Sequence, residues 1–263
     1  MRTLAEIRSF IIDMDGVLWE GDRPLPGLLA FFAALRASGR RFVLATNNAG
    51  RTPEQYTTKL AGMGVTVRNE EILTSAQACA LFLARQAAPG ARVFAIGESS
   101  VQQALAEQGF SLCGLYETDA AYVVCGLDRG LSWDKLATAT LNIRAGAKFI
   151  GTNPDLTLPT ERGLTHGNGA ILAALEAASG AAPIIVGKPE PLMYQIAMER
   201  LGADPQTTAA IGDRLETDIL GAIRAGIHSL LVLSGASRPD ELAGSEIRPT
   251  WVMQGIAEVT EAL

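Results

Sequence analysis

The sequence predicts an α/β fold with a mainly parallel sheet, because short apolar runs alternate with longer segments of helical period. The apolar runs are continuous rather than alternating, as expected for strands that are covered on both faces. Turn-forming or charged residues bound each run. The strands predicted in this way are residues 10–12, 42–44, 184–186, 209–211 and 230–233.

Three helices are predicted between these strands. Residues 28–36 have helical period, and the Thr-Pro-Glu sequence at 52–54 supplies an N-cap, a first-turn proline and an acid to a helix that stops near Gly64. A further helix covers residues 191–201 and ends at Gly202. Strand and helix therefore alternate in both terminal parts of the chain.

A second set of strands and helices occupies the middle of the chain. It opens after an Ala-Pro-Gly sequence at residues 88–90 and closes near Gly180. Its predicted strands are residues 93–96, 122–125 and 148–150, and its predicted helices are residues 99–108 and 133–145. We therefore predict a discontinuous core domain of residues 1–88 and 182–263, with a smaller α/β domain of residues 89–181 inserted into it.

Composition and charge exclude several classes of protein. The 263 residues carry a net charge of −6, so the clustered basic residues of a nucleic-acid-binding protein are not expected. Three cysteines without a C-x-x-C pair favour reduced thiols over disulfides or a zinc knuckle. The sequence has neither the apolar core of a signal peptide nor the roughly 20 apolar residues of a membrane span. A cytoplasmic protein without a membrane or nucleic-acid partner is the expectation.

The few histidines and tryptophans exclude further classes of enzyme and binding protein. His166 and His228 are the only histidines, too few for a zinc hydrolase with several imidazole ligands or for a histidine-based triad. Trp19, Trp133 and Trp251 have no basic surroundings, so we interpret them as packing residues rather than base-stacking residues.

Two carboxylates, Asp13 and Asp15, follow the strand predicted at residues 10–12, directly before Gly16. Ligands of open α/β sheets bind at this end of the strands. Two acids so close resist simultaneous ionisation unless a cation or a hydrogen-bond donor offsets their repulsion. The pair indicates a metal site or a division of acid and base roles, although a solvated Asp-Gly turn would carry the same residues.

Three more groups of polar residues follow predicted strands. Thr46, Asn47 and Asn48 follow residues 42–44, where a hydroxyl and two amides suit phosphoryl oxygens but also suit an ordinary turn. Lys188 follows residues 184–186, where its ammonium can neutralise a dianion or lie at the surface.

The last group is acidic. Asp213 follows the strand predicted at residues 209–211, and Asp218 lies five residues further on, near the start of a helix. Carboxylate oxygens of this kind suit Mg²⁺, which is held by one or two carboxylates and keeps several waters. Asp218 as a simple helix cap is the alternative.

Taken together, the four groups resemble the four signature motifs of the haloacid dehalogenase (HAD) superfamily. The motifs are Asp13-Met14-Asp15-Gly16-Val17, Thr46-Asn47-Asn48, Lys188-Pro189, and Gly212-Asp213 with Thr217-Asp218. The sequences 151–155 (Gly-Thr-Asn-Pro-Asp) and 187–191 (Gly-Lys-Pro-Glu-Pro) are similar to those of the NagD-like branch, which carries a type IIA cap. The resemblance implies a Rossmann-like core with the cap inserted between Asn48 and Lys188, where the chain has room for a whole domain.

The resemblance also implies a chemistry. Asp13 is expected to attack phosphorus and form an aspartyl-phosphate, with Asp15 as general acid and then general base. Mg²⁺ is expected at the Asp13 carboxylate, the Asp15 backbone carbonyl and Asp213, while Asp218 orients a metal-bound water or Lys188. Thr46, the Asn47 backbone and Lys188 are expected to hold the phosphoryl oxygens, with Asn48 in the same loop.

The cap is expected to read the leaving group. Asn153 and Asp155 are the candidates, although they also suit a Pro-containing turn, and Glu161, Arg162 and His166 are placed in the same long loop. The implied substrates are small phosphomonoesters: nucleotides, sugar phosphates, pyridoxal phosphate, phosphoglycolate or the artificial 4-nitrophenyl phosphate. A phosphotransferase and a non-catalytic binding protein are the alternatives, and a homodimer through the cap is implied.

Overall fold

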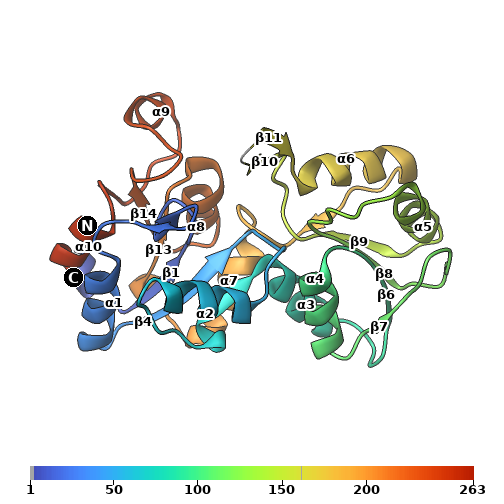
Figure 1. Ribbon diagram of the computed structural model, residues 1–263, viewed down its shortest axis with the longest axis horizontal. Helices are drawn as coiled ribbons and strands as arrows, with labels where there is room; N and C mark the ends of the chain where they lie inside the picture. Colours follow the sequence, from blue (N-terminus) through green and yellow to red (C-terminus); the bar gives the residue numbers. More distant parts are fainter. Residues whose placement is uncertain (1–2, 161) are drawn as a thin grey trace. The chain divides into compact units, whose positions relative to one another are not determined.

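The structure is a computed structural model that describes residues 3–160 and 162–263. It separates into two compact units: 1–46, 53–73 and 188–263 form unit 1, and 47–52 and 74–187 form unit 2. Within the described residues, no helix combines the length and the apolar character needed to cross a membrane. Each unit contains a sheet flanked by helices (Figure 1), so the predicted α/β fold class is confirmed.

Unit 1 is built on a six-stranded sheet in which strands from both ends of the chain are neighbours (Figure 1). Its order is β15 (Trp251–Met253), β14 (His228–Val232), β13 (Thr208–Gly212), β1 (Ser9–Ile12), β4 (Arg41–Thr46) and β5 (Ile72–Thr74). β1 pairs in parallel with β13 and with β4. Its four residues are all buried, which explains the continuous apolar run.

Helices cover this sheet, and a small hairpin follows β1. The helices of unit 1 are α1 (Leu28–Ala37), α2 (Pro53–Gly62), α7 (Pro191–Leu201), α8 (Leu220–Arg224), α9 (Pro239–Gly244) and α10 (Ile256–Ala262). Short helical turns lie at Leu4–Glu6, Asn69–Glu71, Pro205–Thr207 and Leu215–Ile219, the last of them, η4, a π-helical turn. The hairpin consists of β2 (Trp19–Glu20) and β3 (Arg23–Pro24). Phe10, Phe31 and Leu44 belong to the apolar core under the helices.

Unit 2 has its own sheet and its own apolar core. The strand order is β12 (Ile184–Ile185), β9 (Lys148–Gly151), β8 (Tyr122–Cys125), β6 (Arg92–Ile96) and β7 (Ser111–Leu112). Its helices are α3 (Ser75–Ala84), α4 (Ser99–Glu107), α5 (Trp133–Arg144) and α6 (Asn168–Ser179). Phe94, Val123 and Phe149 pack with apolar residues of α5 and α6 in the core.

Two features of unit 2 differ from the sequence-based expectation. The strand predicted at residues 184–186 pairs with β9 in this sheet, and α3 also groups with this unit. The bounds of the two compact units thus differ from those of the predicted domains, and the domain boundaries stay a prediction. The stretch expected as one long loop contains a hairpin of β10 (Thr157–Thr160) and β11 (Gly163–His166). The residues of β11 are exposed, so no buried apolar run in the sequence predicts this strand.

Candidate active site

The carboxyl ends of β1, β4 and β13 lie at one edge of the sheet of unit 1. In the parallel register, Ile12 is opposite both Leu44 and Ile211. Asp13 follows β1, Thr46 ends β4, and Asp213 follows β13, so these three residues start from neighbouring positions. Parallel pairing thus brings residues that are far apart in sequence close together at one end of the strands.

A group of three aspartates forms there. Asp13, Asp213 and Asp218 each offer a carboxylate oxygen within 4.8 Å of the others. Asp213 and Asp218 are buried, and the side chain of Asp13 is only 13% exposed. Within unit 1, therefore, the structure brings together the carboxylates of three of the four aspartates that the sequence predicted for the metal site, Asp15 being the fourth.

The ammonium of Lys188 lies between two of these acids. Its Nζ donates to Asp13 Oδ1 at 2.5 Å, to Asp218 Oδ1 at 2.7 Å and to the Ala45 carbonyl oxygen at 3.1 Å. These acceptors use all three N–H donors of the ammonium. Burial alone would lower the pKa of Lys188, but the two carboxylates outweigh it and raise that pKa, so the buried lysine stays charged.

Asp213 and Asp218 are held by backbone donors. The Ala236 N–H donates to Asp213 Oδ2 at 2.7 Å, and the Arg214 N–H donates to Asp218 Oδ2 at 3.1 Å. Asp218 lies in η4, and with Lys188 on its other oxygen it has protein donors on both oxygens. Its geometry is that of a residue that holds Lys188 in place.

The electrostatics of this group favour a bound cation. Burial, then the charge of Asp218, raise the pKa of Asp213 to about 6, and burial raises the pKa of Asp13 against the attraction of Lys188. Three carboxylates against one ammonium leave two negative charges uncompensated when all are ionised. A divalent cation with hard-oxygen preference would balance them, so the residues fit Mg²⁺.

Asp15 and Thr46 complete the nominated residues of unit 1. Asp15 is exposed on the turn after β1, and its Oδ1 accepts from Trp19 Nε1 at 2.7 Å. Thr46 is buried. The sequence analysis did not predict a role at the site for Trp19, Ala236 or Tyr194, because no polar motif marks these positions. The Tyr194 hydroxyl donates to the Asp218 carbonyl at 2.9 Å.

The remaining nominated residues lie in unit 2 and contact each other. Asn153 Nδ2 donates to the Asn47 carbonyl at 2.9 Å, and Asn47 Nδ2 lies 3.3 Å from Asp155 Oδ2. Asn48 Oδ1 accepts from the Gly50 N–H at 2.8 Å. Asn153 and Asp155 thus brace the loop that follows Thr46, which supports the turn interpretation that the sequence left open.

Two of the polar residues considered further along the cap lie on the β10–β11 hairpin. Arg162 and His166 are exposed on the β10–β11 hairpin. Glu161 lies outside the described residues.

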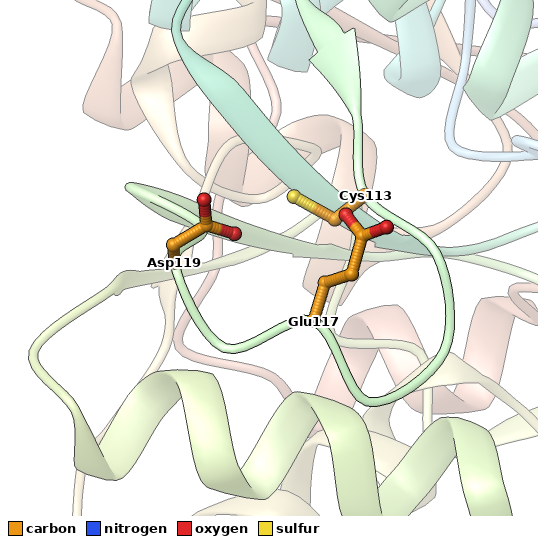
Figure 2. A group of neighbouring side chains, drawn as sticks. All are labelled: Cys113, Glu117 and Asp119. Atoms are coloured by element: carbon orange, nitrogen blue, oxygen red, sulfur yellow. The ribbon is translucent and has the colours of Figure 1, made fainter.

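A second group of potential metal ligands lies in unit 2. Cys113, Glu117 and Asp119 extend toward one another from the chain that follows β7 (Figure 2). Arg92 forms ion pairs with both carboxylates, with Nε 3.1 Å from Asp119 Oδ1. Because the Arg92 guanidinium already pairs with both exposed carboxylates, the group is an ion-pair cluster, and a cation there would have to compete with the guanidinium.

Comparison with known proteins agrees with the geometry. Residues 10–111 match the family described as haloacid dehalogenase-like hydrolase, and residues 185–259 match one described as HAD-hydrolase-like. An acid sugar phosphatase of Staphylococcus aureus is 37% identical over 260 residues, which cover 99% of each chain.

Solved structures give the same result. A 4-nitrophenylphosphatase from Thermotoga maritima is 33% identical, covers 99% of both chains and superimposes with a TM-score of 0.93. A glycerol phosphate phosphatase from Mycobacterium tuberculosis, in complex with magnesium, is 38% identical over 97% of this chain and 77% of its own, with a TM-score of 0.89. The chain therefore belongs to the haloacid dehalogenase superfamily, in its NagD-like branch, and is a phosphatase of that type.

Proposed function

We propose that this phosphatase is a Mg²⁺-dependent phosphomonoesterase that acts on small phosphorylated metabolites, sugar phosphates foremost, with Asp13 as nucleophile. The observation that carries the proposal is the group of three aspartates around one buried ammonium. The relatives support the choice of substrate and metal: one is named an acid sugar phosphatase, and another was solved with magnesium.

Each residue has a role that follows from its contacts. Asp13 Oδ1 is fixed by Lys188, which leaves the other oxygen of this carboxylate for attack on phosphorus. As the bond from Asp13 to phosphorus forms, the bond from phosphorus to the leaving oxygen breaks, and Asp15 gives that oxygen a proton. Water then attacks the phosphorus of the aspartyl-phosphate, and Asp15 takes a proton from this water. The bond from phosphorus to the Asp13 oxygen breaks, which releases phosphate and restores the Asp13 carboxylate.

The same residues hold the charge of the phosphoryl group. Asp13, Asp213 and the Asp15 carbonyl would hold Mg²⁺, and the chemistry that the ion supplies when bound is neutralisation of phosphoryl oxygens. Thr46, with the Asn47 N–H that follows directly in the chain, would bind further phosphoryl oxygens, and Lys188 would exchange one of its present acceptors for another phosphoryl oxygen. Asp218 would keep Lys188 in place, and roles for Asn48, Asn153 and Asp155 toward substrate stay predictions.

Phosphate release from a panel of phosphomonoesters tests the proposal. With Mg²⁺ present, the wild-type protein should hydrolyse 4-nitrophenyl phosphate and at least one sugar phosphate, and a chelator should remove both activities. Asp13→Asn should lower turnover by roughly 10⁴-fold or more, because an amide of the same shape is no nucleophile. Asp240→Asn, at an exposed position of α9, is the matched control. An Asp13→Asn protein with wild-type turnover would refute the assignment.

A further inference from the structure

We propose that Trp19 is the positioning residue of the general acid and base Asp15, an inference that rests on the proposed function. The indole Nε1–H donates to Asp15 Oδ1 at 2.7 Å. Asp15 is on an exposed turn, where a carboxylate without a fixed partner samples several rotamers. A hydrogen bond from a rigid donor selects one of them.

The donor is held by packing on both its ring and its backbone. The Trp19 side chain is fully buried and stacks on Tyr56 of α2, with ring centroids 6.3 Å apart and an interplanar angle of 21°. Lys59 Nζ lies 4.6 Å from the centroid of the indole ring. Lys59 also donates to the Gly21 carbonyl at 2.6 Å, so α2 holds both the indole and the hairpin that carries it.

Backbone hydrogen bonds fix the positions of residues 15 and 19 relative to each other. The Gly16 N–H donates to the Trp19 carbonyl at 2.8 Å, and the Leu18 N–H donates to the Met14 carbonyl at 2.8 Å. This closed turn places residues 15 and 19 side by side, where they also form an isolated bridge. The turn therefore brings the exposed Asp15 next to the buried Trp19, within reach of the indole N–H.

The chemistry of the indole assigns roles to the two carboxylate oxygens. An indole N–H only donates, so Oδ1 stays an acceptor while it is bound to Trp19. The proton that Asp15 transfers then resides on Oδ2. It passes from Oδ2 to the leaving oxygen as the phosphorus–oxygen bond breaks, and a proton from the attacking water returns to Oδ2 in the second step.

Substrates with different leaving groups separate this role from simple packing. The 4-nitrophenolate ion departs readily without a proton, whereas the alkoxide of glycerol phosphate requires one. The ratio kcat/KM reports the steps up to departure of the leaving group, before both substrates share the same aspartyl-phosphate. Loss of positioning should therefore lower kcat/KM selectively for glycerol phosphate or for another alkyl phosphate that the wild type hydrolyses.

The test uses Trp19→Phe, which keeps an aromatic ring but removes the N–H. We expect kcat/KM to fall about ten-fold for the alkyl phosphate and less than about three-fold for 4-nitrophenyl phosphate. Trp251→Phe, which removes an indole N–H from β15, should change neither value. Because both substrates are assayed on one preparation, their ratio does not depend on the fraction of folded protein.

The remaining outcomes overturn the proposal in distinguishable ways. Equal losses for both substrates would make Trp19 a packing residue only, and an unchanged alkyl phosphate rate would show that the hydrogen bond is irrelevant to the proton transfer. A wild-type protein inactive on both substrates would instead refute the proposed function. If Trp19→Phe does not fold, benzothienylalanine at position 19, which replaces only the N–H by sulfur, gives the same comparison.

Discussion

At the scale of single residues, the candidate site depends on a balance of buried charges. Lys188 and Asp218 are almost inaccessible to water, and each satisfies the other through a hydrogen bond of 2.7 Å. Removing one partner of such a pair leaves an unpaired buried charge, which typically costs about 3–5 kcal/mol. Asp213 differs from Asp218, because Oδ2 of Asp213 accepts its hydrogen bond from the neutral Ala236 N–H and not from an ammonium. Burial and the negative charge of Asp218 raise the pKa of Asp213 to about 6, and the Ala236 hydrogen bond lowers it only in part.

The raised pKa of Asp213 predicts how pH affects the metal-free protein. The folded state binds the proton of Asp213 up to about pH 6, whereas the ordinary value is 3.8, so between these values the folded state holds more protons than the unfolded state. The free energy of unfolding contributed by this group is therefore present at low pH and is lost as pH rises through this window. The shift corresponds to roughly 2–3 kcal/mol.

Urea unfolding in the presence of a chelator measures this effect. Asp213→Asn should be about as stable as the wild type near pH 4. As pH rises to 7, the free energy of unfolding of the variant should increasingly exceed that of the wild type. The difference between the two proteins isolates Asp213 from the other carboxylates that titrate in this range. If the wild type became the more stable of the two above pH 6 without metal, the carboxylate would have a compensating partner and the prediction would be wrong.

At the scale of elements, the turn between β1 and β2 sets the shape of the site. Gly16 has φ +81°, and a Cβ atom at this position would lie 2.3 Å from Asp213 Oδ2. Ser234 Oγ also donates to the Gly16 carbonyl at 2.8 Å. The turn can approach Asp213 this closely only because residue 16 has no side chain.

Gly16→Ala should therefore disturb the metal site as well as the backbone. The methyl group must displace Asp213, so the Mg²⁺ concentration required for half-maximal activity should rise by about ten-fold or more. Gly21→Ala is the matched control: it also has positive φ, at +58°, but a Cβ there meets no atom within 4 Å. It should cost roughly 1 kcal/mol of stability and leave the Mg²⁺ requirement unchanged. Equal Mg²⁺ requirements in the two variants would contradict the steric argument.

The elements also show what sequence alone could and could not predict. α7 was predicted with its observed bounds because Pro191 suits a first turn and Gly202 adopts the left-handed conformation that ends the helix. The strand around Ile184 was recognisable as apolar, but an apolar run does not specify which of two sheets it joins. The Trp19 hydrogen bond could not be predicted, since it depends on how the turn closes in three dimensions.

At the scale of the whole molecule, the two units have separate apolar cores, one around Phe10 and Phe31 and the other around Phe94 and Phe149. Independent cores permit separate unfolding transitions. The three aspartates, Lys188 and Thr46 all belong to unit 1. A cation that binds these aspartates therefore stabilises the folded state of unit 1 directly.

Calorimetry with and without Mg²⁺ should show whether the ion stabilises unit 1 and leaves unit 2 unchanged. A ligand at 100 times its Kd adds about 2.7 kcal/mol to the folded state, which corresponds to a rise in Tm of roughly 5–10 °C for a unit of this size. The transition of unit 1 should move by this amount, and the transition of unit 2 should stay near its metal-free Tm. Asp213→Asn should abolish the shift in Tm, because a neutral amide lacks the negative charge with which the carboxylate binds Mg²⁺. A Mg²⁺-dependent shift of the same size in that variant would place the ion elsewhere in the chain.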